Sequence, residues 1–173
     1  IWVCLPFLDS ENKSNATIWW GDVEATVEYC KNAVSRICTE YGGDSSNVFI
    51  AGFSRGAIAC NYIGLHDDEI ASLWRGFICH SHYDGVRKWA YAGSDRRSAA
   101  ARLKRLKQRP QFISHENSVE ATKTYLKSAF PSGNFTFHKL PYSNHTDTWV
   151  LRDIPDRKII REWFDFVLKK EGQ

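Results

Sequence analysis

Several common signatures are missing from the sequence, and each absence excludes a class of protein. There is no methionine, no Cys-x-x-Cys pair, and no apolar run near the roughly 18 residues that a membrane-spanning helix needs. The cysteines all lie in apolar stretches, which favours small buried side chains over a zinc site. They are Cys4, Cys30, Cys38, Cys60 and Cys79.

A strong excess of one charge is also missing. The 23 basic and 20 acidic residues leave a net charge of +3, which is too balanced to indicate nucleic acid or an acidic membrane as a partner. One local basic excess, in residues 96–107, is interpreted as the solvated face of a helix. With 43% hydrophobic residues, the 173-residue chain is expected to fold as one domain over residues 1–173.

Strand and helix patterns alternate along the chain, which predicts an α/β fold with a mostly parallel sheet of about five strands. The expected strands cover residues 1–8, 47–52, 76–80, 110–115 and 135–140. The expected helices cover residues 23–41, 55–65, about 94–107, 119–130 and 156–170. Asp22 is expected to cap the first helix, and Gly42 and Gly43 to end it.

The segment Gly52-Phe53-Ser54-Arg55-Gly56 follows an expected strand and opens an expected helix. This is the nucleophile-elbow pattern, Gly-x-Ser-x-Gly, in the context that it requires. The serine sits on a tight turn, where glycine at positions 52 and 56 is expected to remove collisions. The helix amino terminus favours developing negative charge, so the backbone N–H of Arg55 is the expected oxyanion donor.

A serine hydroxyl needs a base to take its proton, and His145 is the best-placed histidine. It lies in the loop Ser143–Asp147, after the last expected strand and before the last helix. The other histidines lie in or beside expected strands, or in a helix-end loop. The alternative for His145 alone is a solvated loop residue.

The third member, an acid that orients the histidine, is less clearly marked. Glu116 follows the fourth expected strand and is the first choice, although a helix cap or a surface charge explains it nearly as well. Asp84, after the third expected strand, is the second choice. Asp147 is the third, because it lies close to His145 in sequence but is badly aimed.

With these residues the chain resembles the α/β-hydrolases, in the group of esterases, dienelactone hydrolases and polyhydroxybutyrate depolymerases. The resemblance rests on the segment Trp19–Asp22, the elbow, residues 110–116 and the loop Ser143–Asp147. It implies a serine hydrolase that cleaves a small-molecule carboxylic ester through an acyl-enzyme on Ser54, with no metal and no cofactor. A non-catalytic binding or scaffold protein of the same fold, and a peptidase with the same triad, are the alternatives.

The resemblance also implies that something is missing. The family has four strands before the elbow, whereas only residues 1–8 are expected to form one here. The absent third strand would lie beside the elbow strand and supply the second oxyanion amide. Residues 1–8 are therefore expected either to pair directly with residues 47–52 or to leave an exposed sheet edge, which a missing N-terminal segment or a second copy in a homo-oligomer would cover. We also expect feeble hydrolysis by this chain alone.

Overall fold

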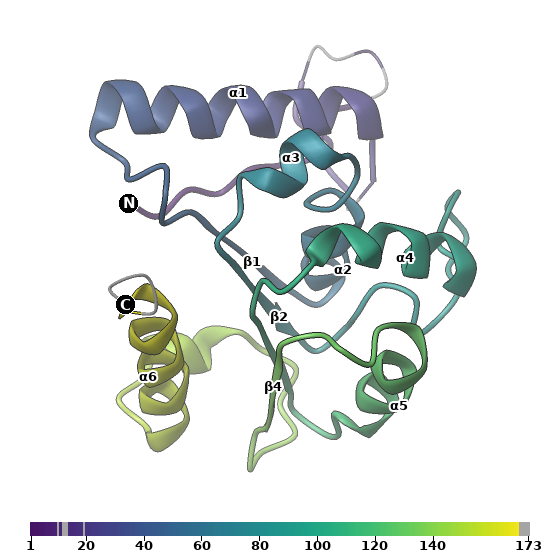
Figure 1. Cartoon of the computed structure of the whole chain (residues 1–173), viewed down its shortest axis with the longest axis vertical. Helices are drawn as coiled ribbons and strands as arrows, with labels where there is room; N and C mark the ends of the chain where they lie inside the picture. Colours follow the sequence, from purple (N-terminus) through teal and green to yellow (C-terminus); the bar gives the residue numbers. More distant parts are fainter. Residues whose placement is uncertain (10, 12–13, 19, 170–173) are drawn as a thin grey trace.

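Four parallel strands form one sheet in the computed structural model, which describes residues 1–9, 11, 14–18 and 20–169. They are β1 (Phe49–Phe53), β2 (Gly76–His80), β3 (Gln111–His115) and β4 (Phe135–Lys139). They lie side by side in this order, with Phe53 beside His80 and His80 beside Ser114. Because all four run the same way, their carboxyl ends share one edge of the sheet (Figure 1).

Helices connect the strands, as the alternating pattern predicts. The α-helices are α1 (Val23–Tyr41), α2 (Arg55–Tyr62), α3 (Asp68–Ser72), α4 (Arg96–Leu103), α5 (Glu120–Ala129) and α6 (Pro155–Lys169). Two 3-10 helices are η1 (Lys104–Leu106) and η2 (Thr148–Leu151). Asp22 caps α1 by accepting a hydrogen bond from the Ala25 N–H at 2.9 Å, and Gly42 ends it with a φ of 71°. Both predictions for this helix are confirmed.

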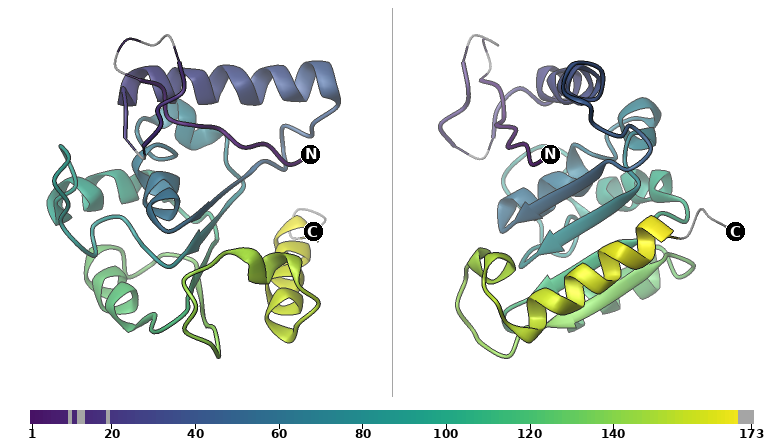
Figure 2. Two further views of the ribbon diagram at one scale, coloured as in Figure 1. Left: turned by 180° about the vertical axis from the view of Figure 1, so that it is seen from behind. Right: turned by 90° about the vertical axis from the view of Figure 1, so that its left-hand side faces the viewer.

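The two faces of the sheet bury separate hydrophobic cores. One core joins the sheet to α1 and α2 and includes Val27, Ile58 and Phe77. The other lies under α6, where Trp163 packs against Phe112 with ring centroids 5.5 Å apart. In the right-hand view of Figure 2, α6 crosses in front of the sheet, whereas α1 is seen end-on above it. Burial on both faces agrees with the mostly apolar sequences of β1 and β2, whereas β4 alternates Phe135 and Phe137 with polar residues.

Residues 1–8 do not form the predicted strand, so the sheet has four described strands rather than five. Leu8 makes only isolated bridges to Asn15 and Asp22, and Trp2 is 83% exposed. An apolar run becomes a strand only if a neighbouring strand pairs with it, and Pro6 has no N–H to offer one.

Cys30, Cys60 and Cys79 are buried as expected, whereas Cys4 is exposed. Helix α3, which the periodicity of the sequence did not predict, begins at an Asp67 cap. Trp19 and Lys170, which belong to predicted segments, lie outside the described residues.

Strand β1 is at the end of the sheet, and within the described chain no strand pairs with its outer side. A cavity of about 500 Å³ runs along this side, between β1, α1 and the first residues of the chain. Its lining includes Val48, Ala51 and Gly56. Of the two expected arrangements, direct pairing of residues 1–8 with this strand and an open edge, the described structure has the open edge. None of the described helices is both long and apolar enough to cross a membrane.

Candidate active site

Ser54 stands on the turn between β1 and α2, at the carboxyl edge of the sheet. Its φ of 55° and ψ of −125° form a strained conformation for a residue with a side chain. The turn is held by the Ser54 N–H, which donates to the His80 carbonyl at 2.9 Å. This location and this strain are those expected of a nucleophile elbow.

The two glycines of the elbow differ in what they do. A Cβ at Gly52 would lie 2.2 Å from the carbonyl oxygen of Gly56, so only glycine fits there. A Cβ at Gly56 would meet nothing within 4 Å. The expectation that both glycines relieve collisions is therefore correct for Gly52 and wrong for Gly56, which faces the open cavity along β1.

His145 reaches Ser54 from the loop after β4. Its Nε2 lies 3.0 Å from the Ser54 Oγ, which is hydrogen-bond distance. The ring of Phe53 packs against the imidazole, with centroids 4.7 Å apart. The side chain of His145 is half exposed, so water and small molecules reach it.

Glu116 lies on the far side of the imidazole, directly after β3. Its Oε1 is 2.5 Å from the Nδ1 of His145, and its Oε2 accepts a hydrogen bond from the Ser81 hydroxyl at 2.6 Å. Burial alone would raise the pKa of Glu116, but the hydrogen bonds from Ser81 and His145 lower it to about 2. The carboxylate is therefore ionised at neutral pH, and the proton of a neutral His145 sits on Nδ1, leaving Nε2 to accept from Ser54.

The loop that carries His145 is fixed to the sheet by another histidine. His80 ends β2 and is buried, and burial lowers its pKa, so the ring is neutral at neutral pH. Its Nε2 lies 3.1 Å from the Thr146 carbonyl oxygen and donates to it. Its Nδ1 accepts from the Ser114 hydroxyl at 3.0 Å. His80 thus holds the backbone beside His145 without facing Ser54.

The second-choice acid, Asp84, faces away from this cluster. Both of its oxygens bind the guanidinium of Arg102, at distances from 2.9 to 3.1 Å, and the side chain is buried. Asp147, the third choice, directly precedes η2, and its backbone carbonyl accepts the Val150 N–H at 3.2 Å. The carboxylate that faces the His145 Nδ1 is that of Glu116.

Ser81 is the member of the cluster that sequence reasoning missed. It follows β2 with a φ of 76°, and its N–H donates to the Ser114 carbonyl at 2.9 Å. A serine in this left-handed region is strained, and the strain aims its hydroxyl at Glu116. Its position directly after a predicted strand is the one signal that could have marked it.

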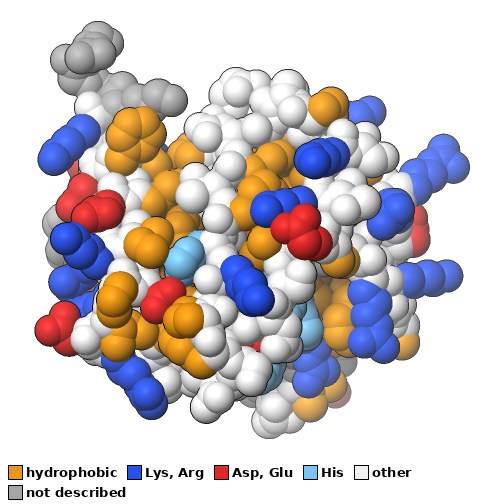
Figure 3. All heavy atoms as spheres, turned by 90° about the horizontal axis from the view of Figure 1, so that it is seen from below, with side chains coloured by type: hydrophobic (Ala, Val, Ile, Leu, Met, Phe, Trp, Pro, Cys, Tyr) orange, Lys and Arg blue, Asp and Glu red, His pale blue; other side chains and the backbone are white. Residues whose placement is uncertain are grey.

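Arg55 is the first residue of α2, so its N–H lies among the amino-terminal groups that have no partner within the helix. This placement suits the predicted oxyanion donor. Seen from below, the surface of the molecule shows hydrophobic and basic side chains with a few histidine and acidic side chains among them (Figure 3).

The fold is similar to those of solved hydrolases. The carboxylesterase from Bacillus cereus matches with a TM-score of 0.51 and 18% identity over 84% of this chain and 62% of its own. An α/β-hydrolase from Vibrio vulnificus matches with a TM-score of 0.51 and 17% identity over 80% of this chain and 57% of its own. No protein-family model and no curated protein matches the sequence. The chain therefore spans less than two thirds of these solved structures, and it has the α/β-hydrolase fold.

Proposed function

We propose that this chain is a serine hydrolase that cleaves carboxylic esters of small molecules through an acyl-enzyme on Ser54. The observation that carries the proposal is the continuous relay from Ser54 through His145 to Glu116, with contacts of 3.0 and 2.5 Å. The three residues follow one another in the chain in the order of the α/β-hydrolases.

Each residue has one role in the proposed reaction. The Ser54 Oγ attacks the ester carbonyl carbon while the Nε2 of His145 takes its proton. The Glu116 carboxylate holds the imidazole and stabilises the imidazolium that forms. His145 then gives the proton to the leaving alcohol oxygen as the carbon–oxygen bond breaks. Water, activated by the same histidine, releases the acid from Ser54.

The oxyanion hole is the incomplete part of the proposed site. The Arg55 N–H is one donor, and the site needs a second. Loss of one such donor costs roughly 3 kcal/mol, or about a hundredfold in rate. We therefore propose feeble turnover by residues 1–173 acting as one α/β-hydrolase domain, with the open edge of β1 covered in the working enzyme by a further N-terminal segment or a second copy.

The test combines labelling with turnover. The purified chain is incubated with a fluorophosphonate probe and, separately, with p-nitrophenyl acetate. We expect labelling of Ser54 and slow hydrolysis, both lost in Ser54→Ala. Ser94→Ala is the matched control, because Ser94 is buried and bonds to the Trp89 backbone away from the relay. An unlabelled Ser54 would contradict the proposal and favour a non-catalytic binding protein, which the open β1 edge would suit.

A further inference from the structure

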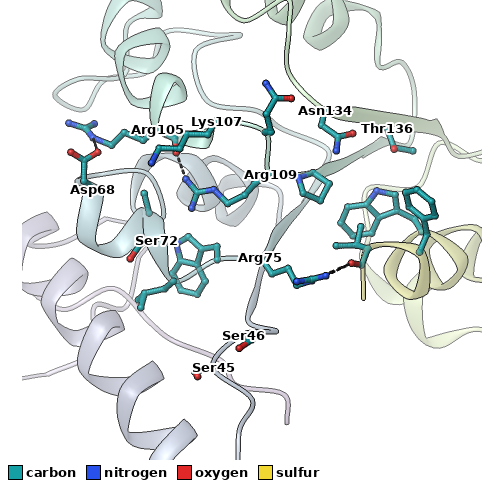
Figure 4. Close-up of a pocket in the computed structure, with 18 residues that line it drawn as sticks. Ser45, Ser46, Asp68, Ser72, Arg75, Arg105, Lys107, Arg109, Asn134 and Thr136 are labelled. Atoms are coloured by element: carbon teal, nitrogen blue, oxygen red, sulfur yellow. Dashed lines mark hydrogen bonds and ion pairs between the residues drawn. The ribbon is translucent and has the colours of Figure 1, made fainter. Parts of the chain in front are cut away.

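A cavity of about 710 Å³ lies at the amino-terminal edge of the sheet (Figure 4). Its lining includes Arg75, Pro110 and Asn134, which directly precede β2, β3 and β4. Because the strands are parallel, Ser54 and Glu116 lie at the opposite edge. The cavity is therefore separate from the proposed catalytic site.

The lining of the cavity is basic. It holds Arg75, Arg105, Lys107 and Arg109, and the one acidic residue in the described lining is Asp68. The Asp68 carboxylate is 3.2 Å from the Nε of Arg105. With four basic residues and one acidic residue, the cavity carries a net charge of +3, equal to that of the whole chain. Elsewhere the charges of the molecule balance.

Arg109 is held in place by neutral groups. Its guanidinium donates to the Leu106 carbonyl at 3.0 Å and also to the Arg105 carbonyl. Carbonyl oxygens orient a guanidinium but leave its charge uncompensated. Burial accordingly lowers the pKa of Arg109. An anion in the cavity would relieve this cost.

Lys107 shows that the cavity wall is strained. Its φ of 54° and ψ of −126° belong to a region that a residue with a side chain rarely adopts. Glycine would adopt this conformation at no steric cost, yet the position carries an exposed lysine. In Figure 4, Arg105, Lys107 and Arg109 extend toward the α3 side of the cavity, whereas Arg75 reaches toward α6. A strained backbone residue beside several basic side chains is a feature that binding sites often show.

We infer that Lys107 and Arg109 bind the phosphate group of a small organic phosphate. Two neighbouring cations match the double negative charge of a phosphate monoester, whereas a carboxylate would need only one. The cavity lies within the range of about 300–1,000 Å³ that is usual for small-molecule sites and is far larger than a phosphate ion. The organic part lies toward Trp163 and Phe166, which line the α6 side.

The test is calorimetric titration of the full chain with adenosine 5′-monophosphate, adenosine and inorganic phosphate at low salt. We expect the monophosphate to bind with a Kd below about 1 mM, and adenosine and inorganic phosphate each to bind about tenfold more weakly or worse. Lys107→Gln should weaken binding of the monophosphate about tenfold, and Lys107→Arg should restore it to within about threefold. Ser54→Ala should bind as the unmodified chain does, so the outcome is independent of the proposed hydrolase activity.

Lys104→Gln is the matched control, because Lys104 lies in the same basic segment, is exposed, and is not part of the lining. It should change the Kd by less than about twofold. Equal losses in the Lys104 and Lys107 variants would mean diffuse charge attraction and would overturn the site. So would an unmodified chain that binds no monophosphate. Inorganic phosphate that binds as tightly as the monophosphate would overturn the assignment of an organic ligand.

Discussion

Glu116 and Asp84 are two buried carboxylates that follow neighbouring strands, yet their surroundings push them in opposite directions. Glu116 accepts hydrogen bonds from Ser81 and faces the imidazole of His145, and its pKa falls to about 2. Asp84 is buried more completely, and burial raises its pKa to about 6 although Arg102 binds both of its oxygens. The degree of burial alone therefore does not decide in which direction the pKa of a carboxylate shifts.

The difference lies in what each partner can still do. Arg102 is also held by the Gly93 carbonyl at 2.8 Å, so Asp84 joins a fixed ion pair. His145 has a second ring nitrogen, which faces Ser54, and imidazole is the side chain best suited to accept and return a proton. A carboxylate next to a titratable partner at an open edge can serve chemistry, whereas one next to a permanent cation serves the fold.

The largest expected difference between Glu116 and Asp84 is in turnover. Glu116→Gln should lower kcat for p-nitrophenyl acetate about a thousandfold or more, because the amide no longer holds the correct tautomer of His145. Asp84→Asn should leave kcat within about threefold, since Asp84 touches no member of the relay. Steady-state kinetics of the two variants decide the matter, and a reversed pattern would show that the acid was assigned wrongly.

The next expected effect is on stability, where substitution of Asp84 should matter more than substitution of Glu116. Asp84→Ala removes the hydrogen-bond acceptors that Asp84 offers to the buried guanidinium of Arg102, whether or not the carboxyl group is ionised, and should lower the free energy of unfolding by about 3 kcal/mol. Arg102 also stacks over the Tyr62 ring at 4.3 Å, so its own burial persists. Urea denaturation measures the change. A variant as stable as the parent chain would mean that the Asp84–Arg102 pair contributes nothing net.

The pH dependence of stability should separate the two carboxylates by sign. Asp84 has a pKa raised from 3.8 to about 6, so its ionisation opposes folding, and stability should fall by about 2 kcal/mol as pH rises from 4 to 6. Glu116 has a pKa lowered from 4.5 to about 2, so its contribution is present above pH 4.5 and is lost as pH falls toward 2. Denaturation midpoints across pH should lose the first trend in Asp84→Asn and the second in Glu116→Gln. Unchanged profiles in both variants would contradict this account.

The smallest predicted effect is that of Ser81, which would act on the proposed reaction only through Glu116. Ser81→Ala should lower kcat about tenfold with KM unchanged. It should also shift the acidic limb of the profile of kcat against pH to higher pH, because the Glu116 carboxylate loses a hydrogen-bond donor that stabilises its charge. Ser81→Gly separates the hydroxyl from the backbone strain at φ 76°. Loss of activity in both variants would assign the effect to the hydroxyl, whereas recovery in the glycine variant would assign it to the backbone.

What the sequence could predict here is local. The elbow around Ser54 is written in consecutive residues, and the positions of Glu116 and His145 follow from which strand each one succeeds. The four observed strands were predicted because each is a short segment with apolar or alternating side chains, bounded by turn residues.

What it could not predict depends on neighbours across the fold. Ser81 meets Glu116 because β2 pairs with β3, and no spacing along the chain encodes that contact. Residues 1–8 look like a strand because the pattern does not show whether a partner is present. The sequence could not choose between Glu116 and Asp84 for the same reason, because only the fold shows that Asp84 is paired with Arg102.

Gly56 makes it possible to test whether the open edge of β1 is covered. An added methyl group at this residue meets nothing in the chain as described, and the residue lines the cavity beside β1. Gly56→Ala should leave stability and activity unchanged while the cavity is empty. It should lower both once another strand fills the cavity. The effect of this one substitution thus reports whether the cavity is occupied. A comparison of Gly56→Ala in short and extended forms of the protein would show whether another segment packs beside the Ser54 turn.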